Sequence, residues 1–398
     1  MGLFSPKRIY ADWAATTPLH PQVARAMKAA RKAWANPNAI HTEGVKAKKM
    51  LEAARVSFAK NVGVRPEEVY FTSGGTEANA TIIQGVLRTR LEKGIKDVHV
   101  VSSSIEHSSI LETLRIFEKH GVKVTYVDPQ ADGVVRVEDM LAAITPATAL
   151  VTCMYANNEI GTIQPVSKIG AGIRKIRAEK LGKGDSAHEA QFPVFHTDAS
   201  QAPLWLSCEI EGLRADAMTL DAHKMQGPKG VGALIVRRHV SFEPLMAGGG
   251  QERGMRPTTE SVELVAGISE ALSVAQTGRT ARAEKATAIR DYFFDLLTKE
   301  IPDAIINGSI DRRLPNNVNI SLPKITDPEF AVLTLDKMGI ACSTKSSCLK
   351  GEEDSYVVKA LAAKPVWRSR NTLRFSLAPN ATRRDVHIIV GALKKLIY

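Results

Sequence analysis

Strand-like and helix-like segments alternate along most of this 398-residue chain, and this alternation limits the fold more than any other feature. Segments with helical spacing of apolar residues separate the strand-like runs. Those runs lie at 98–102, 122–127, 149–155, 192–197, 216–220 and 231–237. Strands separated by helices form βαβ units, so the pattern predicts an α/β fold with a parallel sheet. With 44% hydrophobic residues, the chain can bury one large core and a smaller one.

A glycine-rich turn follows the strand-like run at 69–71 and leads into a helical segment. Gly74 and Gly75 let an anion approach the backbone, where the N–H groups at the helix start point toward it. The hydroxyl of Thr76 adds a donor. Many tight glycine turns bind nothing, and this one fits neither the P-loop nor the dinucleotide motif. The turn therefore indicates a phosphate cradle only together with other residues.

Two polar side chains follow predicted parallel strands at the edge where open α/β sheets bind ligands. Asp198 comes after the run at 192–197, and His107 after the run at 98–102. A buried carboxylate needs a positive partner, which a pyridinium nitrogen would supply. An imidazole there could stack on an aromatic cofactor and shuttle protons. Taken singly, Asp198 is more simply a loop or capping aspartate, and His107 a core or capping histidine.

Lys224 lies between a strand-like run and a glycine turn. Its amine can bond to an aldehyde only when neutral, so the site must lower the pKa of the lysine by partial burial or a nearby cation. His223 and Lys229 are close in sequence. An arbitrary lysine would lie on a solvated face, since the chain has 53 Lys and Arg residues. However, the order of cradle, histidine, strand-end aspartate and lysine predicts a pyridoxal 5'-phosphate site.

With these motifs, the chain resembles the class V, fold-type I pyridoxal-phosphate enzymes, and most closely the cysteine desulfurases of the NifS/IscS type. Further motifs extend the resemblance over nearly the whole sequence, at Ile9 to Thr17, Ala35 to His41, Tyr155 to Gly161, Gly250 to Arg256 and Leu373 to Leu377. The resemblance implies a large cofactor-binding domain at 14–264 with a mainly parallel seven-stranded sheet. It also implies a smaller α/β domain formed by 1–13 and 265–398, and a homodimer.

The resemblance assigns a role to each candidate site residue. Lys224 carries the aldehyde and moves the substrate Cα proton, while His107 is an acid–base group for the substrate thiol. The implied cofactor-binding residues are Gly75, Thr76, His107, Asn158, Asp198, Gln201, Asp221, His223, Lys224 and, from the other subunit, Thr259. Arg374 forks onto the carboxylate of the substrate L-cysteine, with Asn36 nearby. A surface salt bridge is the simpler alternative for Arg374, and no metal site is expected.

The desulfurase function needs a nucleophilic cysteine, for which Cys348 is the candidate. It ends a run of small and hydroxyl residues as the family motif does, although Lys345 stands where glycine is usual. Such a loop can swing toward the cofactor, and a nearby cation favours the thiolate. Cys342 and Cys153 lie in apolar segments and are expected to be packed. The implied reaction converts L-cysteine to L-alanine and passes the sulfur, as a Cys348 persulfide, to an acceptor protein for iron–sulfur clusters or thiolated tRNA.

Three positions depart from the family pattern. Asp221 stands where a serine usually donates to the phosphate, and a carboxylate there is repulsive unless it is protonated or turned away. Cofactor affinity is therefore expected to be affected. Thr258 replaces a glycine, and the segment 378–380 replaces the usual Gly-Arg after the Arg374 motif.

The resemblance leaves related enzymes open, and composition bears on a non-enzyme function and on the cellular location. A selenocysteine lyase or another class V aminotransferase would share the cofactor site, but an aminotransferase does not need Cys348. The net charge of +11 favours a basic tRNA- or protein-binding module, but the charges are dispersed, so nucleic acid is not expected as the primary partner. Four cysteines and the lack of an 18-residue apolar run predict a soluble, cytoplasmic protein without a membrane anchor.

Overall fold

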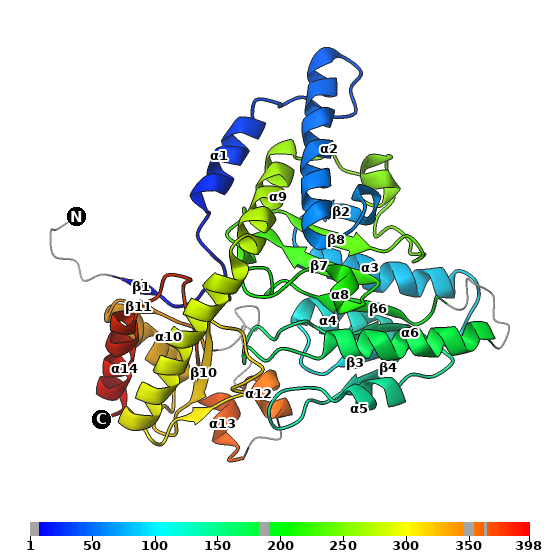
Figure 1. Ribbon diagram of the computed structural model, residues 1–398. Helices are drawn as coiled ribbons and strands as arrows, with labels where there is room; N and C mark the ends of the chain where they lie inside the picture. Colours follow the sequence, from blue (N-terminus) through cyan, green and yellow to red (C-terminus); the bar gives the residue numbers. More distant parts are fainter. Residues whose placement is uncertain (1–7, 183–190, 345–353, 362–363) are drawn as a thin grey trace.

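A seven-stranded sheet forms the centre of the computed structural model, which describes residues 8–182, 191–344, 354–361 and 364–398 (Figure 1). The strand order is β2-β8-β7-β6-β5-β3-β4. The strands are β2 (Val69–Thr72), β3 (His99–Ser103), β4 (Lys123–Val127), β5 (Thr148–Thr152), β6 (Val194–Asp198), β7 (Ala217–Asp221) and β8 (Gly232–Val236). The predicted α/β fold with a mainly parallel seven-stranded sheet is confirmed.

One strand runs against the expectation of a parallel sheet. From β7 to β4 all neighbours are parallel, but β8 pairs antiparallel with both β7 and β2. The prediction of a parallel strand at 231–237 was therefore wrong. The physical reason is the short connection at 222–231, which contains one turn of 3-10 helix, η2 (Ala222–Lys224). A parallel crossover needs about a dozen residues or more, usually with a full helix.

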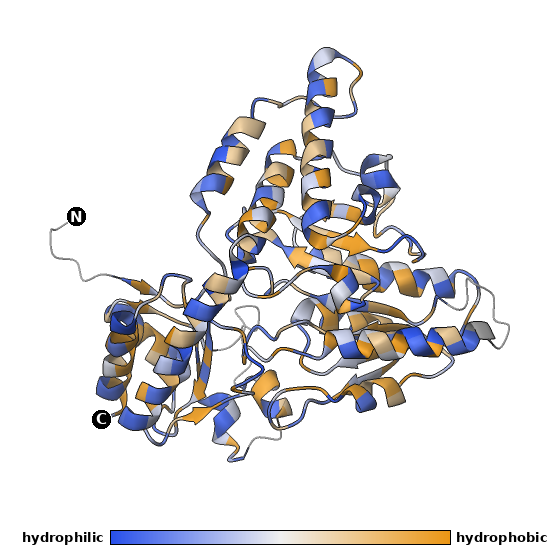
Figure 2. Cartoon of the chain, in the orientation of Figure 1, coloured by the Kyte–Doolittle hydropathy of each residue, from blue (hydrophilic) through white to orange (hydrophobic). Residues whose placement is uncertain are grey.

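Helices cover both faces of this sheet, and successive strand residues contact opposite layers. On β5, Leu150 packs with α3 (Gly75–Leu91) and α4 (Ser108–Glu118), whereas Val151 packs with the core on the other face. The helices of that second layer are α1 (Pro21–Ala30), α2 (Thr42–Val62), α5 (Val137–Ala142), α6 (Val166–Gly182), α8 (Ile210–Leu213) and α9 (Val262–Gln276). The central strands are accordingly apolar over most of their length (Figure 2).

A second core surrounds the C-terminal strands (Figure 1). One small antiparallel sheet has the order β12-β10-β9, and β1 pairs in parallel with β11. These strands are β1 (Ile9–Tyr10), β9 (Ile305–Ile306), β10 (Asn317–Ser321), β11 (Ile340–Ala341) and β12 (Thr372–Ser376). The helices packed there are α10 (Arg279–Glu300), α11 (Pro328–Lys337) and α14 (Arg383–Ile397).

Short helical elements connect the larger ones. Two 3-10 turns, η1 (Pro66–Glu68) and η3 (Gln251–Gly254), and two short helices, α12 (Tyr356–Ala360) and α13 (Trp367–Arg370), lie in connections. Residues of α9, including Ile268 and Leu272, pack in the core with α2, so the domain boundary at 264 stays a prediction. Within the described ranges, no helix is both long and apolar enough to cross a membrane.

Candidate active site

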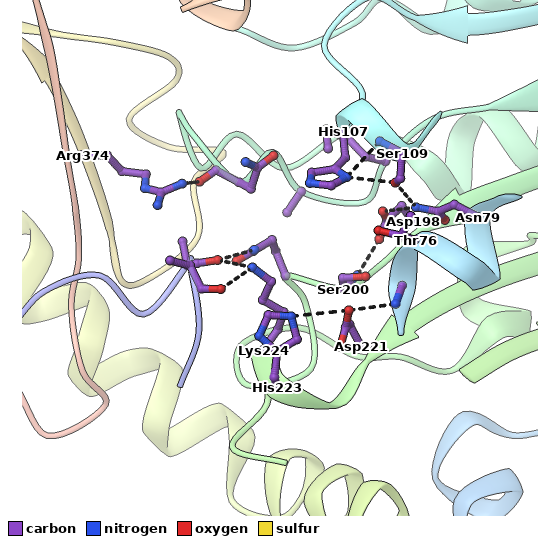
Figure 3. Close-up of a pocket in the computed structure, with 17 residues that line it drawn as sticks. Thr76, Asn79, His107, Ser109, Asp198, Ser200, Asp221, His223, Lys224 and Arg374 are labelled. Atoms are coloured by element: carbon purple, nitrogen blue, oxygen red, sulfur yellow. Dashed lines mark hydrogen bonds and ion pairs between the residues drawn. The ribbon is translucent and has the colours of Figure 1, made fainter. Parts of the chain in front are cut away.

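A cavity of about 190 Å³ lies beside the carboxyl ends of β6 and β7 (Figure 3). Side chains from distant parts of the sequence converge on it, from the start of α3 to strand β12. The predicted site residues that line it are Gly75, Thr76, His107, Asn158, Asp198, Gln201, Asp221, His223, Lys224 and Arg374. The structure therefore brings together most of the residues that the sequence predicted for cofactor and substrate.

Asp198 is held in a defined orientation at the end of β6. Its side chain accepts hydrogen bonds from Nδ2 of Asn79 at 2.8 Å and from the backbone N–H of Ser200 at 2.9 Å, and the residue is 8% exposed. Neither Asn79 nor Ser200 was expected at the site from the sequence. Asn79 lies one helical turn beyond Gly75, so helical spacing could have placed it at this edge of the sheet.

His107 both caps a helix and lines the cavity. Its Nδ1 accepts the backbone N–H of Ser109 at 3.2 Å and lies 2.9 Å from the Ser109 hydroxyl, at the start of α4. An Nδ1 that accepts a backbone N–H carries no proton in the neutral ring, so that tautomer has its proton on Nε2. The capping alternative is therefore correct for His107, and it is compatible with a place in the cavity.

Lys224 ends the 3-10 turn after β7 and reaches the N-terminal segment. Its Nζ donates to the backbone carbonyls of Ala14 at 2.6 Å and Ala15 at 2.7 Å. His223 lines the cavity and places Nδ1 3.0 Å from a threonine hydroxyl, whereas Lys229 is exposed and is not part of the lining. Of the two cations suggested by sequence, only His223 is therefore at the site. The carbonyls of Ala14 and Ala15 were missed because backbone groups give no side-chain signal.

Arg374 is buried, so the surface-salt-bridge alternative is wrong. It is 1% exposed, and its Nη1 donates to the carbonyl of Asn158 at 3.0 Å while Nη2 pairs with Asp12 at 2.8 Å. Its buried Nε has no hydrogen-bond partner in the described part of the chain. A buried donor without a hydrogen bond costs free energy, so the Arg374 position is energetically unusual for an interior arginine. The pairing with Asp12 was not foreseen.

Glu106 lies fully buried behind His107. Its Oε1 accepts from the Ser103 hydroxyl at 2.5 Å and from the backbone N–H of Met154 at 2.7 Å, and Oε2 has no partner among described groups. Burial raises the pKa of Glu106 to about 7. This carboxyl therefore adds less negative charge near Asp198 at neutral pH than its residue type suggests.

Some predicted residues lie elsewhere. Asn36 and Thr259 are exposed and do not line the cavity within one chain, so their roles stay predictions. Cys348 lies outside the described residues. The other three cysteines, Cys153, Cys208 and Cys342, are buried. Burial raises the pKa of Cys342 and of Cys208 to about 12, and it raises the pKa of Cys153 well above its ordinary value. The predicted packing of Cys342 and Cys153 is confirmed.

The Aminotransferase class-V family model matches residues 9–389. The cysteine desulfurase IscS of Dictyoglomus turgidum is 35% identical over 393 residues, which covers 98% of this chain and 95% of that protein. The chain belongs to the class V aminotransferases and, within them, to the cysteine desulfurases. IscS of Clostridium botulinum is 36% identical over 394 residues, with 98% of this chain and 94% of that protein covered. The predicted family is therefore confirmed.

Solved structures agree with this assignment to the cysteine desulfurases. A NifS-like protein superposes with a TM-score of 0.87 at 30% identity, covering 98% of this chain and 99% of that chain. The protein SspA, solved in complex with cysteine, superposes with a TM-score of 0.76 at 31% identity, covering 94% of this chain and 100% of the other. Membership in this family implies dependence on pyridoxal phosphate.

The residues present fit that cofactor. The cavity holds a lysine amine, an oriented carboxylate and the first turn of α3, which are the groups needed for an aldehyde, a ring nitrogen and a phosphate. A Cβ on Gly75 would lie 3.0 Å from Asp221 Oδ2 and 3.3 Å from the Ser200 hydroxyl, so this position is too tight for a side chain. One group, the Asp221 carboxylate, is unusual for a phosphate site.

Proposed function

We propose that this protein is a pyridoxal-phosphate-dependent cysteine desulfurase that converts L-cysteine to L-alanine and transfers the sulfur as an enzyme persulfide. The observation that carries the proposal is the convergence of Lys224, Asp198, His107 and Arg374 on one cavity. These residues come from separate elements, and the sequence predicts each of them at the site. An amine, a carboxylate, an imidazole and a guanidinium are also the groups that this reaction requires.

The cofactor would be held by residues already at the cavity. Lys224 would bind the aldehyde, Asp198 the ring nitrogen and Gln201 the ring hydroxyl, with Asn158 beside the ring. The phosphate would be held by the start of α3 at Gly75 and Thr76, together with His223. When bound, the cofactor supplies an electron-poor ring that accepts the electron pair released at the substrate Cα.

Substrate orientation would come from Arg374. Its guanidinium lines the cavity and is already fixed by the Asn158 carbonyl and the Asp12 carboxylate, so it would face the carboxylate of L-cysteine. The amine of Lys224 would then accept the proton from the substrate Cα. His107, whose neutral ring holds its proton on Nε2, would exchange a proton with the substrate thiol.

Sulfur transfer requires a thiolate that can reach the substrate, and Cys348 is our candidate. The S–S bond to Cys348 would form as the C–S bond of the substrate breaks, and Cβ would gain a proton to become the methyl group of alanine. The other three cysteines are buried with raised pKa values, so they are poor thiolates at neutral pH. Their burial supports Cys348 by elimination.

The partners of the reaction belong to the same proposal. The acceptor of the persulfide sulfur would be a protein, with an iron–sulfur scaffold as the first candidate. We also propose a homodimer in which Thr259 contributes to the cofactor site of the other subunit, since Thr259 is exposed in one chain. Asn36 is likewise exposed, and its role near the substrate stays a prediction. The cytoplasmic location stays a prediction from the sequence.

Lys224→Ala tests the proposal directly. After borohydride reduction with pyridoxal phosphate, we expect the wild-type protein to carry the cofactor mass on the peptide containing Lys224, and the variant to lose both this mass and alanine release. Lys229→Ala is the matched control, because Lys229 is exposed and outside the cavity, and it should keep both. Full alanine and sulfide release from cysteine by Lys224→Ala would contradict the proposal.

A further inference from the structure

The start of α3, proposed above to hold the cofactor phosphate, already contacts a carboxylate. Oδ2 of Asp221 accepts the backbone N–H of Gly75 at 2.8 Å (Figure 3). His223 Nε2 lies 3.5 Å from the same oxygen. The Asp221 side chain is only 14% exposed, so water screens these contacts weakly. Two of the groups proposed to hold the phosphate therefore already contact one internal anion.

The charge of the surroundings favours the ionised form of Asp221. Although burial opposes ionisation, the hydrogen bond and charge of His223 hold the pKa of Asp221 below its ordinary value. The helix N-terminus adds partial positive charge, since α3 extends from Gly75 to Leu91. The other acidic residue of this turn, Glu77, pairs with Arg256 at 2.5 Å and accepts the Ser73 N–H at 2.7 Å. Asp221 is therefore the carboxylate that contacts the Gly75 N–H.

We propose that Asp221 is an internal competitor for the cofactor phosphate. Its carboxylate stabilises the protein by binding the Gly75 N–H and His223, and the phosphate can use these donors only when Asp221 turns away. This inference rests on the proposed function, because it concerns the phosphate of the proposed cofactor. The competition weakens cofactor binding and makes the cofactor exchangeable, whereas a serine at 221 would donate to the phosphate instead.

The competition predicts that replacing Asp221 raises the affinity for pyridoxal phosphate but lowers the stability of the cofactor-free protein. In Asp221→Ser and Asp221→Asn, the dissociation constant of pyridoxal phosphate should fall by roughly tenfold or more, the size expected for one charged hydrogen-bond partner. The melting temperature of the cofactor-stripped variants should decrease, because the first turn of α3 loses its anion. If Asp221 had only a structural role, its replacement would lower both the affinity for pyridoxal phosphate and the melting temperature.

Asp327→Ala is the matched control. Asp327 also binds the start of a helix, with Oδ1 accepting the Phe330 N–H of α11 at 2.9 Å, but it lies outside the cavity. This variant should lose melting temperature without any change in cofactor affinity. Unchanged or weaker binding of pyridoxal phosphate by folded Asp221→Ser would overturn the proposal.

Inorganic phosphate separates this proposal from the proposed function. Phosphate should raise the melting temperature of cofactor-stripped Asp221→Ser more than that of the wild-type protein, because the variant leaves the donors of α3 free for an anion. Equal stabilisation of both proteins would overturn the competition alone. Loss of pyridoxal-phosphate binding in every variant and in the wild type would count against the proposed function, whatever the result with phosphate.

Discussion

Replacing Arg374 by lysine tests the substrate end of the cavity. In the structure, the guanidinium lines the cavity and spans the Asn158 carbonyl and the Asp12 carboxylate. A lysine offers one compact ammonium on a flexible stem, so it cannot keep both anchors and also fork onto a carboxylate. We expect the variant to bind L-cysteine less tightly.

The magnitude follows from the hydrogen bonds that are lost. A hydrogen bond between charged groups contributes about 1.5–3 kcal/mol, so the loss of one to the substrate carboxylate should raise KM by roughly 10- to 150-fold. Affinity for pyridoxal phosphate should change little, because Arg374 contacts none of the groups proposed to hold the ring nitrogen or the phosphate. A selective effect on KM therefore distinguishes substrate binding from collapse of the cavity.

The assay is alanine release at increasing L-cysteine, together with a cofactor titration. Arg290→Lys is the matched control, because Arg290 is also a buried arginine that pairs with a carboxylate, Asp291 at 2.7 Å, and donates to a backbone carbonyl, that of Arg313 at 3.2 Å. Arg290 lies outside the cavity, so the Arg290→Lys variant should have a lower melting temperature but an unchanged KM. An unchanged KM in Arg374→Lys, or an equal rise in both variants, would refute the reasoning.

Three further predictions address the chemistry and the stability of the fold. Asp198→Asn should still bind the cofactor but lose turnover by about two orders of magnitude or more, because a neutral amide cannot pair with a ring N–H cation; normal alanine release would remove Asp198 from the site. Cys348→Ala should lose persulfide and sulfide production while Cys342→Ala keeps both, and mass spectrometry of cysteine-treated protein without reductant should locate the added sulfur on Cys348. Although burial raises the pKa of Asp216, hydrogen bonds from cationic side chains bring it down to about 2. Ionised Asp216 should therefore contribute about 2 kcal/mol to the free energy of unfolding above pH 4, and this contribution should be lost as the pH falls toward 2. Urea unfolding of the wild type and of Asp216→Asn across this pH range would measure it.

Periodicity predicted the strands of the central sheet, but it could not predict their directions. An apolar run such as 231–237 has the same pattern in either orientation when both of its faces are buried, as those of β8 are. The connection at 222–231 carried the missing signal, because it is too short for a helical crossover. The length of the loop therefore indicates the strand direction, which the hydrophobic pattern does not.

The sequence could predict those site residues that directly follow a strand of the central sheet. Asp198 and His107 could be placed because parallel strands present their carboxyl ends at one edge. Arg374 could not be placed in that way, because it comes from a different sheet and was identified through the family resemblance. The sequence could not predict the role of Asp12 either, since its partner Arg374 is 362 residues away in sequence.

The segment that contains Asp12 links the two ends of the cavity through backbone geometry. The Trp13 N–H donates to the Ser376 carbonyl at 3.1 Å, which ties this segment to strand β12 beside Arg374. Ala14 and Ala15, next in the chain, place their carbonyls on Lys224. The short segment 12–15 therefore contacts both the guanidinium and the amine. If Arg374 binds the substrate carboxylate as proposed, the substrate Cα, one bond from the carboxylate carbon, lies in the cavity that Lys224 also lines.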